Sequence, residues 1–200
     1  MDKRANIGLN ENQFRILDLF TRGFDKEYYV REVGMLLSLP PRTAQLNLES
    51  LEKLGVLESI TKGKIKNYKL RNNPIVKEYI KFTEIFKNIR FIEKDDRIKE
   101  IILKIGYLIE GTGLVFGSYA KGTQKEDSDL DIFVIGSYNQ KETEKISELY
   151  NTKISVKNYT NALFRKEIKN DFLIREILNN HIVFKGVDNF IEIIYGQQTN

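Results

Sequence analysis

A polar segment between two short apolar runs, at residues 114–135, constrains the fold more than any other feature of the sequence. The segment reads LVFGSYAKGTQKEDSDLDIFVI. Each apolar run has the length of a short strand, Gly117-Ser118 makes a turn after the first, and the second opens with Asp129 and includes Asp131. Because side chains alternate along a strand, the two aspartates are predicted to share one face while Leu130 points into the core.

The residue types in this segment predict a site for a phosphate and a metal ion. Two adjacent carboxylates repel each other unless a divalent cation neutralises them, and oxygen ligands of this kind suit Mg²⁺. Gly117 lets a phosphate approach the backbone closely, and Ser118 with its neighbouring amides can donate hydrogen bonds to phosphate oxygens. The alternative at this point is a polar turn with two surface acids.

Cysteine and histidine content excludes most other catalytic chemistry. The chain has no cysteine, and His181 is its one histidine, so disulfides, a thiolate nucleophile and a zinc site built from cysteines or several histidines are excluded. Any metal chemistry must use carboxylates. His181 itself is predicted to be a surface or boundary residue. The longest apolar runs are only a few residues, and we expect a cytoplasmic protein that does not cross a membrane.

Charge is distributed unevenly along the chain. Residues 1–90 carry 17 basic and 11 acidic side chains, whereas residues 91–200 carry 15 and 17. The first part is therefore net positive and the second net negative, within a total charge of +4. This asymmetry favours the first part as the one that faces a polyanion.

Hydrophobic spacing in the first part predicts three short helices and then a hairpin. The helices are expected at residues 10–20, at 30–37 and from Pro41 or Arg42 to Leu54, with Gly55 as the residue that ends the third. A strand at 57–61, a turn at 62–64 and a return strand at 65–70 complete the hairpin.

The stretch LPPRTAQLNLESLEKLGVLESITKGKIKNYKL closely resembles the winged helix-turn-helix family from its turn through its wing, over about residues 8–71. The resemblance implies that the third helix lies in the major groove of double-stranded DNA and that the wing contacts phosphates. The alternatives are a unit used for protein contacts or dimerisation, and a hairpin that is only a solvated edge. The implied DNA-binding residues are Arg42, Thr43, Gln45 and Asn47 on the helix and Lys62, Lys64 and Lys66 on the wing.

A further helix from Pro74 to about Arg90 is predicted to link two domains. Its apolar stripe of Tyr79, Phe82 and Phe86 offers a contact surface for a homodimer or for packing between the domains. Another helix is expected at 95–109, ended by the glycines of residues 110–113.

The spacing Gly-Ser, ten residues, Asp-x-Asp resembles the nucleotidyltransferase superfamily related to DNA polymerase β, most closely its minimal branch. The resemblance covers about residues 95–195, and the tail FLIREILNNHIVFKGVDNFIEII is similar to the helix, strand and helix that close that domain. It implies that Gly117 and Ser118 hold nucleotide phosphates and that Asp129 and Asp131 are the catalytic carboxylates that hold Mg²⁺.

The family's third carboxylate comes from a later strand, which is predicted here at Lys153 to Lys157. Counting along this strand places Ser155 at the position of that acid. Glu167 and Asp171 are nearby in sequence but do not match the position. A serine neither holds a metal strongly nor acts as a base at neutral pH, so this departure predicts nucleotide binding with weak or no transfer.

These observations predict an α/β (α+β) chain in three parts. Residues 1–72 form a winged helix, 73–94 a linker helix, and 95–200 a nucleotidyltransferase-like domain with a small mixed sheet. The expected function is a DNA-binding transcriptional regulator that binds Mg²⁺ with ATP or another nucleoside triphosphate. The alternatives are an active enzyme that transfers AMP to a protein hydroxyl, as antitoxins of this branch do, and a DNA-binding scaffold.

Overall fold

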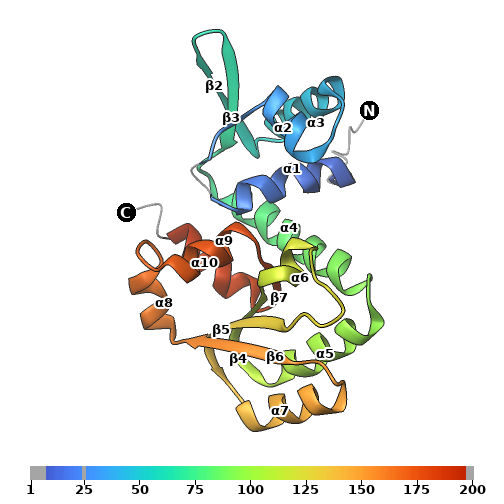
Figure 1. Cartoon of the computed structure of the whole chain (residues 1–200). Helices are drawn as coiled ribbons and strands as arrows, with labels where there is room; N and C mark the ends of the chain where they lie inside the picture. The colour runs from blue at the N-terminus through green and yellow to red at the C-terminus, as the bar shows by residue number, and fades with distance from the viewer. Residues whose placement is uncertain (1–7, 24–25, 197–200) are drawn as a thin grey trace, which may run out of the picture. The chain divides into compact units, whose positions relative to one another are not determined.

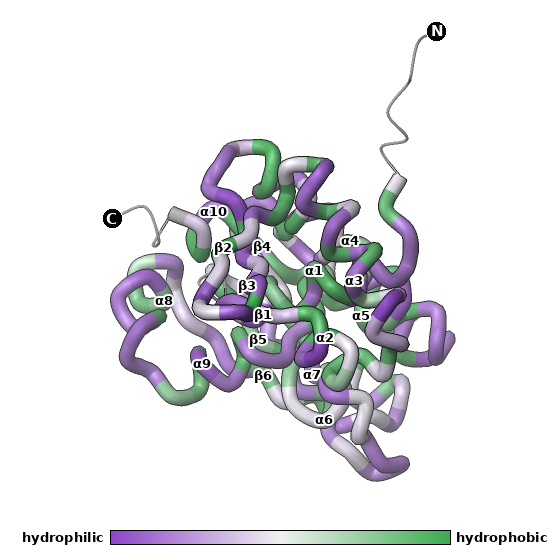
Figure 2. Tube along the Cα trace, turned by 90° about the horizontal axis from the view of Figure 1, so that it is seen from above, coloured by the Kyte–Doolittle hydropathy of each residue, from purple (hydrophilic) through white to green (hydrophobic). Residues whose placement is uncertain are grey.

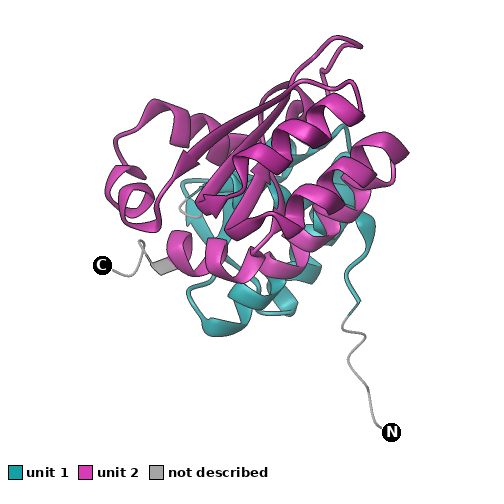
Figure 3. Ribbon diagram, turned by 90° about the horizontal axis from the view of Figure 1, so that it is seen from below, with its two compact units in different colours: residues 1–79 teal, residues 80–200 magenta. Residues whose placement is uncertain are grey.

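The computed structural model describes residues 8–23 and 26–196 of the chain. The chain divides into two compact units, residues 1–79 and residues 80–200 (Figure 3). The boundary falls inside helix α4 (Pro74–Ile92), which starts in the first unit and continues into the second. Among the described residues, no helix is long and apolar enough to cross a bilayer.

The first unit is a bundle of three helices with a small antiparallel sheet (Figure 1). Asn10 caps the first helix: its side chain accepts from the Gln13 N–H, and the Gln13 side chain accepts from the Asn10 N–H. The strands lie in the order β1-β3-β2. The elements are α1 (Glu11–Thr21), β1 (Tyr28–Tyr29), α2 (Val30–Leu37), α3 (Pro41–Lys53), β2 (Leu57–Lys62) and β3 (Ile65–Leu70).

Strands β2 and β3 form the predicted hairpin, whose last pair is Lys62 with Ile65. The turn is therefore only Gly63 and Lys64, and Gly63 has a φ of +62°, which glycine adopts without steric cost. Three helices followed by this hairpin confirm the winged helix fold. The two-residue strand β1, which pairs with β3, was not predicted.

The second unit is a four-stranded sheet with helices on its faces (Figure 1). Its strand order is β6-β5-β4-β7; β5 and β6 are parallel and the other neighbours are antiparallel, so the small mixed sheet is confirmed. After α4 the elements are α5 (Asp96–Tyr107), β4 (Ile109–Val115), α6 (Gly117–Lys121), β5 (Leu130–Tyr138), α7 (Gln140–Leu149), β6 (Ile154–Tyr159), α8 (Asn161–Glu167), α9 (Phe172–Asn179), β7 (Ile182–Lys185) and α10 (Val187–Gly196).

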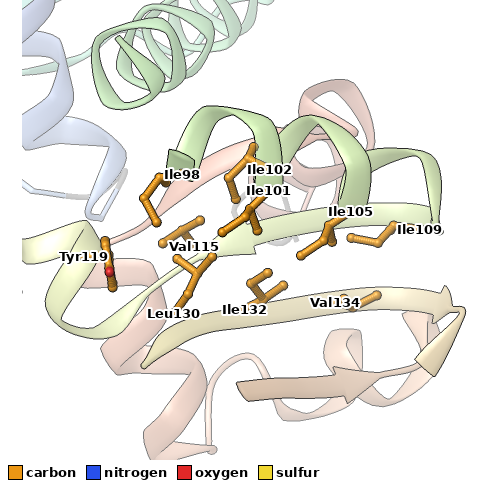
Figure 4. Packing of buried hydrophobic residues seen from close by; sticks show 10 residues of the cluster. All are labelled: Ile98, Ile101, Ile102, Ile105, Ile109, Val115, Tyr119, Leu130, Ile132 and Val134. Atoms are coloured by element: carbon orange, nitrogen blue, oxygen red, sulfur yellow. The ribbon is translucent and has the colours of Figure 1, made fainter. Parts of the chain in front are cut away.

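One face of the sheet carries the apolar core that positions β5. Leu130, Ile132 and Val134 point from β5 toward helix α5 and meet its buried isoleucines (Figure 4). Hydrophobic and hydrophilic stretches alternate along the chain, as the colours of Figure 2 show. Burial of this alternating set fixes which side chains of β5 face the opposite side. Buried residues of the cluster are Ile98, Ile101, Ile102, Ile105, Ile109, Val115, Tyr119, Leu130, Ile132 and Val134.

The start of β4 differs from the sequence prediction. Residues 110–113 were expected to form a break, and Ile109 was expected to end a helix, but β4 already begins at Ile109. Gly111 (φ +118°) and Gly136 (φ +131°) lie opposite each other on β4 and β5. A Cβ at either glycine would collide with a backbone carbonyl of the other strand. These glycines therefore permit close strand pairing and do not break the chain.

His181 is buried, whereas a surface or boundary position was predicted. Its side chain is 1% exposed, its Nε2 lies 3.3 Å from Oε1 of Glu84 on α4, and its ring packs edge-on against Phe190 of α10. Lys87 Nζ contacts the same Glu84 oxygen at 3.0 Å. A buried carboxylate with these two partners ties α4 to the end of the chain.

Candidate functional site

Gly117 stands at the turn from β4 into α6, with a φ of +68°. A Cβ here would collide with Oδ2 of Asp131, so the position needs glycine for two reasons: the left-handed backbone and the carboxylate packed against it. The Phe116 N–H donates to the Asp131 carbonyl at 3.0 Å, which holds the turn beside β5. The structure thus brings together the Gly-Ser turn and the aspartates, as the sequence predicted. Ser118, the next residue, is half-buried.

Asp131 is the second residue of β5, on the face opposite the buried Leu130, and Asp129 immediately precedes the strand. Burial, and next the charge of Asp129, raise the pKa of the Asp131 carboxyl above its ordinary value. The Asp129 carboxylate forms an ion pair with Lys153, with 2.6 Å between Oδ2 and Nζ. The two acids are therefore close enough to repel, and one of them is neutralised by a lysine.

Ser155 is the direct partner of Asp131 in the parallel pairing of β5 with β6. Residues paired in this way point to the same face of the sheet, so the serine lies beside the carboxylate pair. Strand β6 begins one residue later than predicted, at Ile154, and continues to Tyr159. The position next to Asp131 on the neighbouring strand therefore carries a hydroxyl and no acid.

The sequence did not single out two charged residues near this site. Lys153 precedes β6, and Glu176 of α9 raises the pKa of Asp131 through its charge. Glu176 also forms an ion pair with Lys121 at the end of α6, with 2.9 Å between Oε1 and Nζ. Chain folding alone brings α9 here, so no local sequence signal could have revealed Glu176.

Asp171, which was considered as a third acid, has another role. Its Oδ1 accepts from the N–H groups of Leu173 and Ile174, capping α9, and its Oδ2 accepts from the Tyr159 hydroxyl at 2.7 Å. The Tyr159 hydrogen bond and these backbone N–H groups lower the pKa of Asp171. Glu167, the other acid considered, ends helix α8.

A cavity of 610 Å³ opens on the Asp129 side of the pair. Asp129 and Lys153 both line it, together with Arg97, Tyr119 and the loop at 126–128. The cavity is large enough for a small ligand or for one part of a larger one.

The carboxylate pair fits a single Mg²⁺ that arrives with phosphate ligands. Within residues 8–23 and 26–196, no group of three His, Cys, Asp or Glu side chains is placed to hold a metal ion. Mg²⁺ is commonly bound through one or two carboxylates, with waters and substrate phosphates as its other ligands. Two adjacent aspartates beside a glycine turn are a donor set of this kind.

On α3 of the first unit, three of the four predicted base-reading residues remain accessible. Arg42 is exposed and its Nη1 donates to Gln45 Oε1 at 3.2 Å; Thr43 and Gln45 are half-buried. Asn47 differs from the prediction. It is 9% exposed, its Nδ2 donates to the Thr43 carbonyl, and its Oδ1 accepts from Asn10 of α1. These bonds use the Asn47 amide inside the unit, so it does not face outward.

The three wing lysines are exposed but differ in their partners. Lys62 forms an ion pair with Glu27 and Lys66 with Glu52, each at 2.7 Å. Lys66 Nζ also lies 4.9 Å from the ring centroid of Tyr68. Lys64 lies at the tip, and none of the described residues forms an ion pair with it.

Comparison with known proteins identifies part of the second unit. Residues 95–184 match the family model described as "Nucleotidyltransferase domain". This part of the chain is a nucleotidyltransferase domain. The nucleotidyltransferase domain contains the Gly117 turn, both aspartates and Ser155, and its match confirms the resemblance drawn from the sequence. No curated protein matches the chain.

Solved structures show only distant likeness. The adhesin competence repressor AdcR of Streptococcus pyogenes shares 20% identity over 50% of this chain and 78% of its own, with a TM-score of 0.33. ZitR of Lactococcus lactis shares 17% over 52% and 75%, also with a TM-score of 0.33. TrmBL2, an archaeal chromatin protein, shares 17% over 85% and 70%, with a TM-score of 0.30. TM-scores this low do not establish a shared fold.

Proposed function

We propose that the chain is a DNA-binding transcriptional regulator whose nucleotidyltransferase domain binds a nucleoside triphosphate together with Mg²⁺. The observation that carries the nucleotide part is the Gly117 turn packed against the Asp131 carboxylate, with Asp129 close enough for its charge to raise the pKa of Asp131. Gly117 and Ser118 would hold phosphate oxygens, and Asp129 and Asp131 would hold the metal. A bound Mg²⁺ would neutralise negative charge on the phosphates.

The DNA part of the proposal rests on chemistry in the first unit. Arg42, Thr43 and Gln45 offer hydrogen-bond donors and acceptors at the start of α3, where winged helices read base edges. The wing lysines Lys62, Lys64 and Lys66 would contact phosphates. Asn47 is left out of this interface because its amide is bonded within the unit. A homodimer through α4 would match paired half-sites on DNA.

Titration of the purified protein with ATP, with and without Mg²⁺, tests the nucleotide part. We expect binding that requires Mg²⁺ and is lost in Asp129→Asn and Asp131→Asn. Binding that survives both substitutions contradicts the assignment. Measuring DNA affinity at several ATP concentrations then separates a regulator from a scaffold, because a scaffold's DNA affinity does not depend on nucleotide.

A second candidate function is transfer of a nucleoside monophosphate to a protein hydroxyl. The observation in its favour is Glu176, a third acid whose charge reaches Asp131. In this reaction the hydroxyl oxygen bonds to the α-phosphorus, the bond from that phosphorus to the bridging oxygen breaks, and pyrophosphate leaves. The hydroxyl proton must pass to a base, and Ser155 is not one at neutral pH.

Labelled ATP incubated with the protein and candidate acceptors tests this second function. If the site lacks its third acid, wild-type transfer is slow or absent and Ser155→Asp raises it. Robust wild-type transfer that is lost in Glu176→Gln instead assigns the base to α9. The matched control is Glu110→Gln, an exposed acid of the same unit that lies at the opposite end of β4 from Gly117.

A further inference from the structure

Lys153 is held beside the carboxylate pair by its backbone, while most of its side chain is exposed. Its carbonyl accepts from the Leu130 N–H at 2.8 Å, which places the residue where β5 begins. Its ammonium lies 2.6 Å from Asp129 Oδ2, yet the side chain is 78% exposed. The ammonium is therefore tied at one point only, by an ion pair of a kind that contributes little when exposed to water.

Lys153 is also the positive charge with the largest effect on the neighbouring acid, Asp131. Two lysines lower the pKa of Asp131, and Lys153 has the larger effect of the two, ahead of Lys157. The ammonium of Lys153, charged at neutral pH like that of any exposed lysine, contacts Asp129 directly at 2.6 Å. Lys153 thus neutralises part of the negative charge that a metal ion would neutralise at the same carboxylates.

A metal ion and the ammonium cannot both stay on Asp129 without repelling each other. The ammonium holds Oδ2 of Asp129, so a metal that takes this oxygen displaces it, and a metal-bound triphosphate offers it new acceptors. A lysine suits this exchange, because its four-carbon stem is flexible and its three donors bind phosphate as a point charge. The 610 Å³ cavity bordered by Asp129 and Lys153 gives the ammonium room to move.

We propose that Lys153 is a nucleotide-binding residue that exchanges partners: it holds Asp129 while the site is empty and moves to the triphosphate when nucleotide and Mg²⁺ enter. This inference rests on the proposed function and names a residue that the Gly-Ser and Asp-x-Asp motifs do not contain. It also assigns Lys153 two opposite effects, against the metal alone and in favour of the metal with nucleotide.

Calorimetric titrations of the full chain with MgCl₂ alone and with ATP plus MgCl₂ test the proposal. Lys153→Met removes the charge and keeps the stem. We expect it to bind Mg²⁺ alone more tightly than wild type, because no ammonium has to leave, and to bind ATP with Mg²⁺ about tenfold more weakly. Lys153→Arg should keep the affinity for ATP with Mg²⁺ within about threefold of wild type.

Lys157→Met is the matched control, because Lys157 also lowers the pKa of Asp131 but forms no ion pair within the described part of the chain. It measures the effect of removing a nearby positive charge while the Lys153–Asp129 ion pair stays in place. Equal reductions of ATP affinity in Lys153→Met and Lys157→Met overturn the Lys153 proposal alone. Wild-type protein that fails to bind ATP with Mg²⁺ overturns the proposed function, and the exchange with it.

Discussion

At Asp131, folding favours the protonated carboxyl, whereas binding of a metal ion requires the charged carboxylate. Burial and the charge of Asp129 raise its pKa, so the folded chain holds a proton there more firmly than the unfolded chain does. The stability that such a group contributes is fully present below the ordinary carboxyl pKa. It is lost as the pH rises through the raised pKa of the folded chain. The folded protein is therefore destabilised by this carboxylate at neutral pH.

We predict that Asp131→Asn stabilises the metal-free protein at about pH 8 relative to wild type, and that the gain shrinks toward about pH 4. The reason is that asparagine is neutral at both values. Urea unfolding in the presence of a chelator measures the difference. Asp129→Asn is the control, because it also loses the Lys153 ion pair. A gain for Asp131→Asn that is equal at both pH values would contradict the explanation.

At the residue scale, the placement of residues within one segment could be predicted from the sequence, whereas contacts between distant segments could not. Gly117, Asp129 and Asp131 follow from local alternation along a strand, and the structure brings them together. Asn47 and His181 were misjudged, because their partners Asn10 and Glu84 are distant in sequence. Polar residues with distant partners cannot be separated from exposed ones by spacing alone.

The turn between β4 and α6 is the element that gives the site its shape. Gly117 and Gly122 bracket α6 with nearly equal positive φ values, +68° and +69°. A Cβ at Gly117 would collide with Asp131, whereas a Cβ at Gly122 would meet nothing within 4 Å. Substituting the two glycines in turn therefore distinguishes the cost of the left-handed backbone, present at both, from the cost of the collision, present only at Gly117.

We predict that Gly122→Ala lowers the free energy of unfolding by about 1 kcal/mol, the cost of a left-handed residue with a side chain. Gly117→Ala should cost more and should also abolish Mg²⁺-dependent ATP binding, since it displaces the Asp131 carboxylate. Urea unfolding and ATP titration of both variants check this. Equal behaviour of the two variants would show that the packing of Gly117 against Asp131 is unimportant.

The wing is the element that carries the electrostatic prediction. Changing Lys62, Lys64 and Lys66 together to alanine should weaken DNA binding on all sequences. It should lower the slope of log K against log salt by up to about 0.9 for each phosphate that the wing no longer neutralises. Lys64→Ala alone should already lower the slope, because no ion pair within the described residues competes for it.

Arg42→Ala is the contrasting variant for the wing prediction. Its guanidinium lies on α3, so its removal should relax sequence preference, at a cost of about 1–3 kcal/mol on the preferred site. A salt slope that is unchanged in the triple lysine variant would remove the wing from the interface.

Among the elements, those with a strong period or a clear ending were predicted best. Helices α1, α2 and α3 and the hairpin have the expected bounds within about one residue, since the Asn10 cap, the prolines at 40 and 41 and the glycines at 55 and 63 mark several of their ends. The start of β4 was missed because Gly111 and Gly113 are typical of a loop when their partners on β5 are unknown. Strand β1, only two residues long, depends wholly on its pairing with β3.

For the whole molecule, helix α4 carries the prediction of a homodimer. Of the predicted stripe, Tyr79 and Phe86 are half-buried and Phe82 is 48% exposed, whereas Ile85 and Ile89 of the same helix are each 44% exposed. Ile85→Glu combined with Ile89→Glu should shift the protein from a dimer to a 23.4 kDa monomer in sedimentation. The control is Leu103→Glu on α5, an apolar residue that is 52% exposed. A wild-type monomer at micromolar concentration would contradict the dimer.

The glycine pair Gly111 and Gly136 has a consequence for the opposite end of β5. Each backbone passes so close to the other that any side chain would wedge the strands apart, and this close pass exists in only one alignment of β4 with β5. A slip of one residue would turn Asp131 into the apolar layer under α5 and bring Ile132 to the ligand face. The glycine pair therefore favours the native alignment of β4 with β5. This alignment keeps both carboxylates accessible at the other end of the strand.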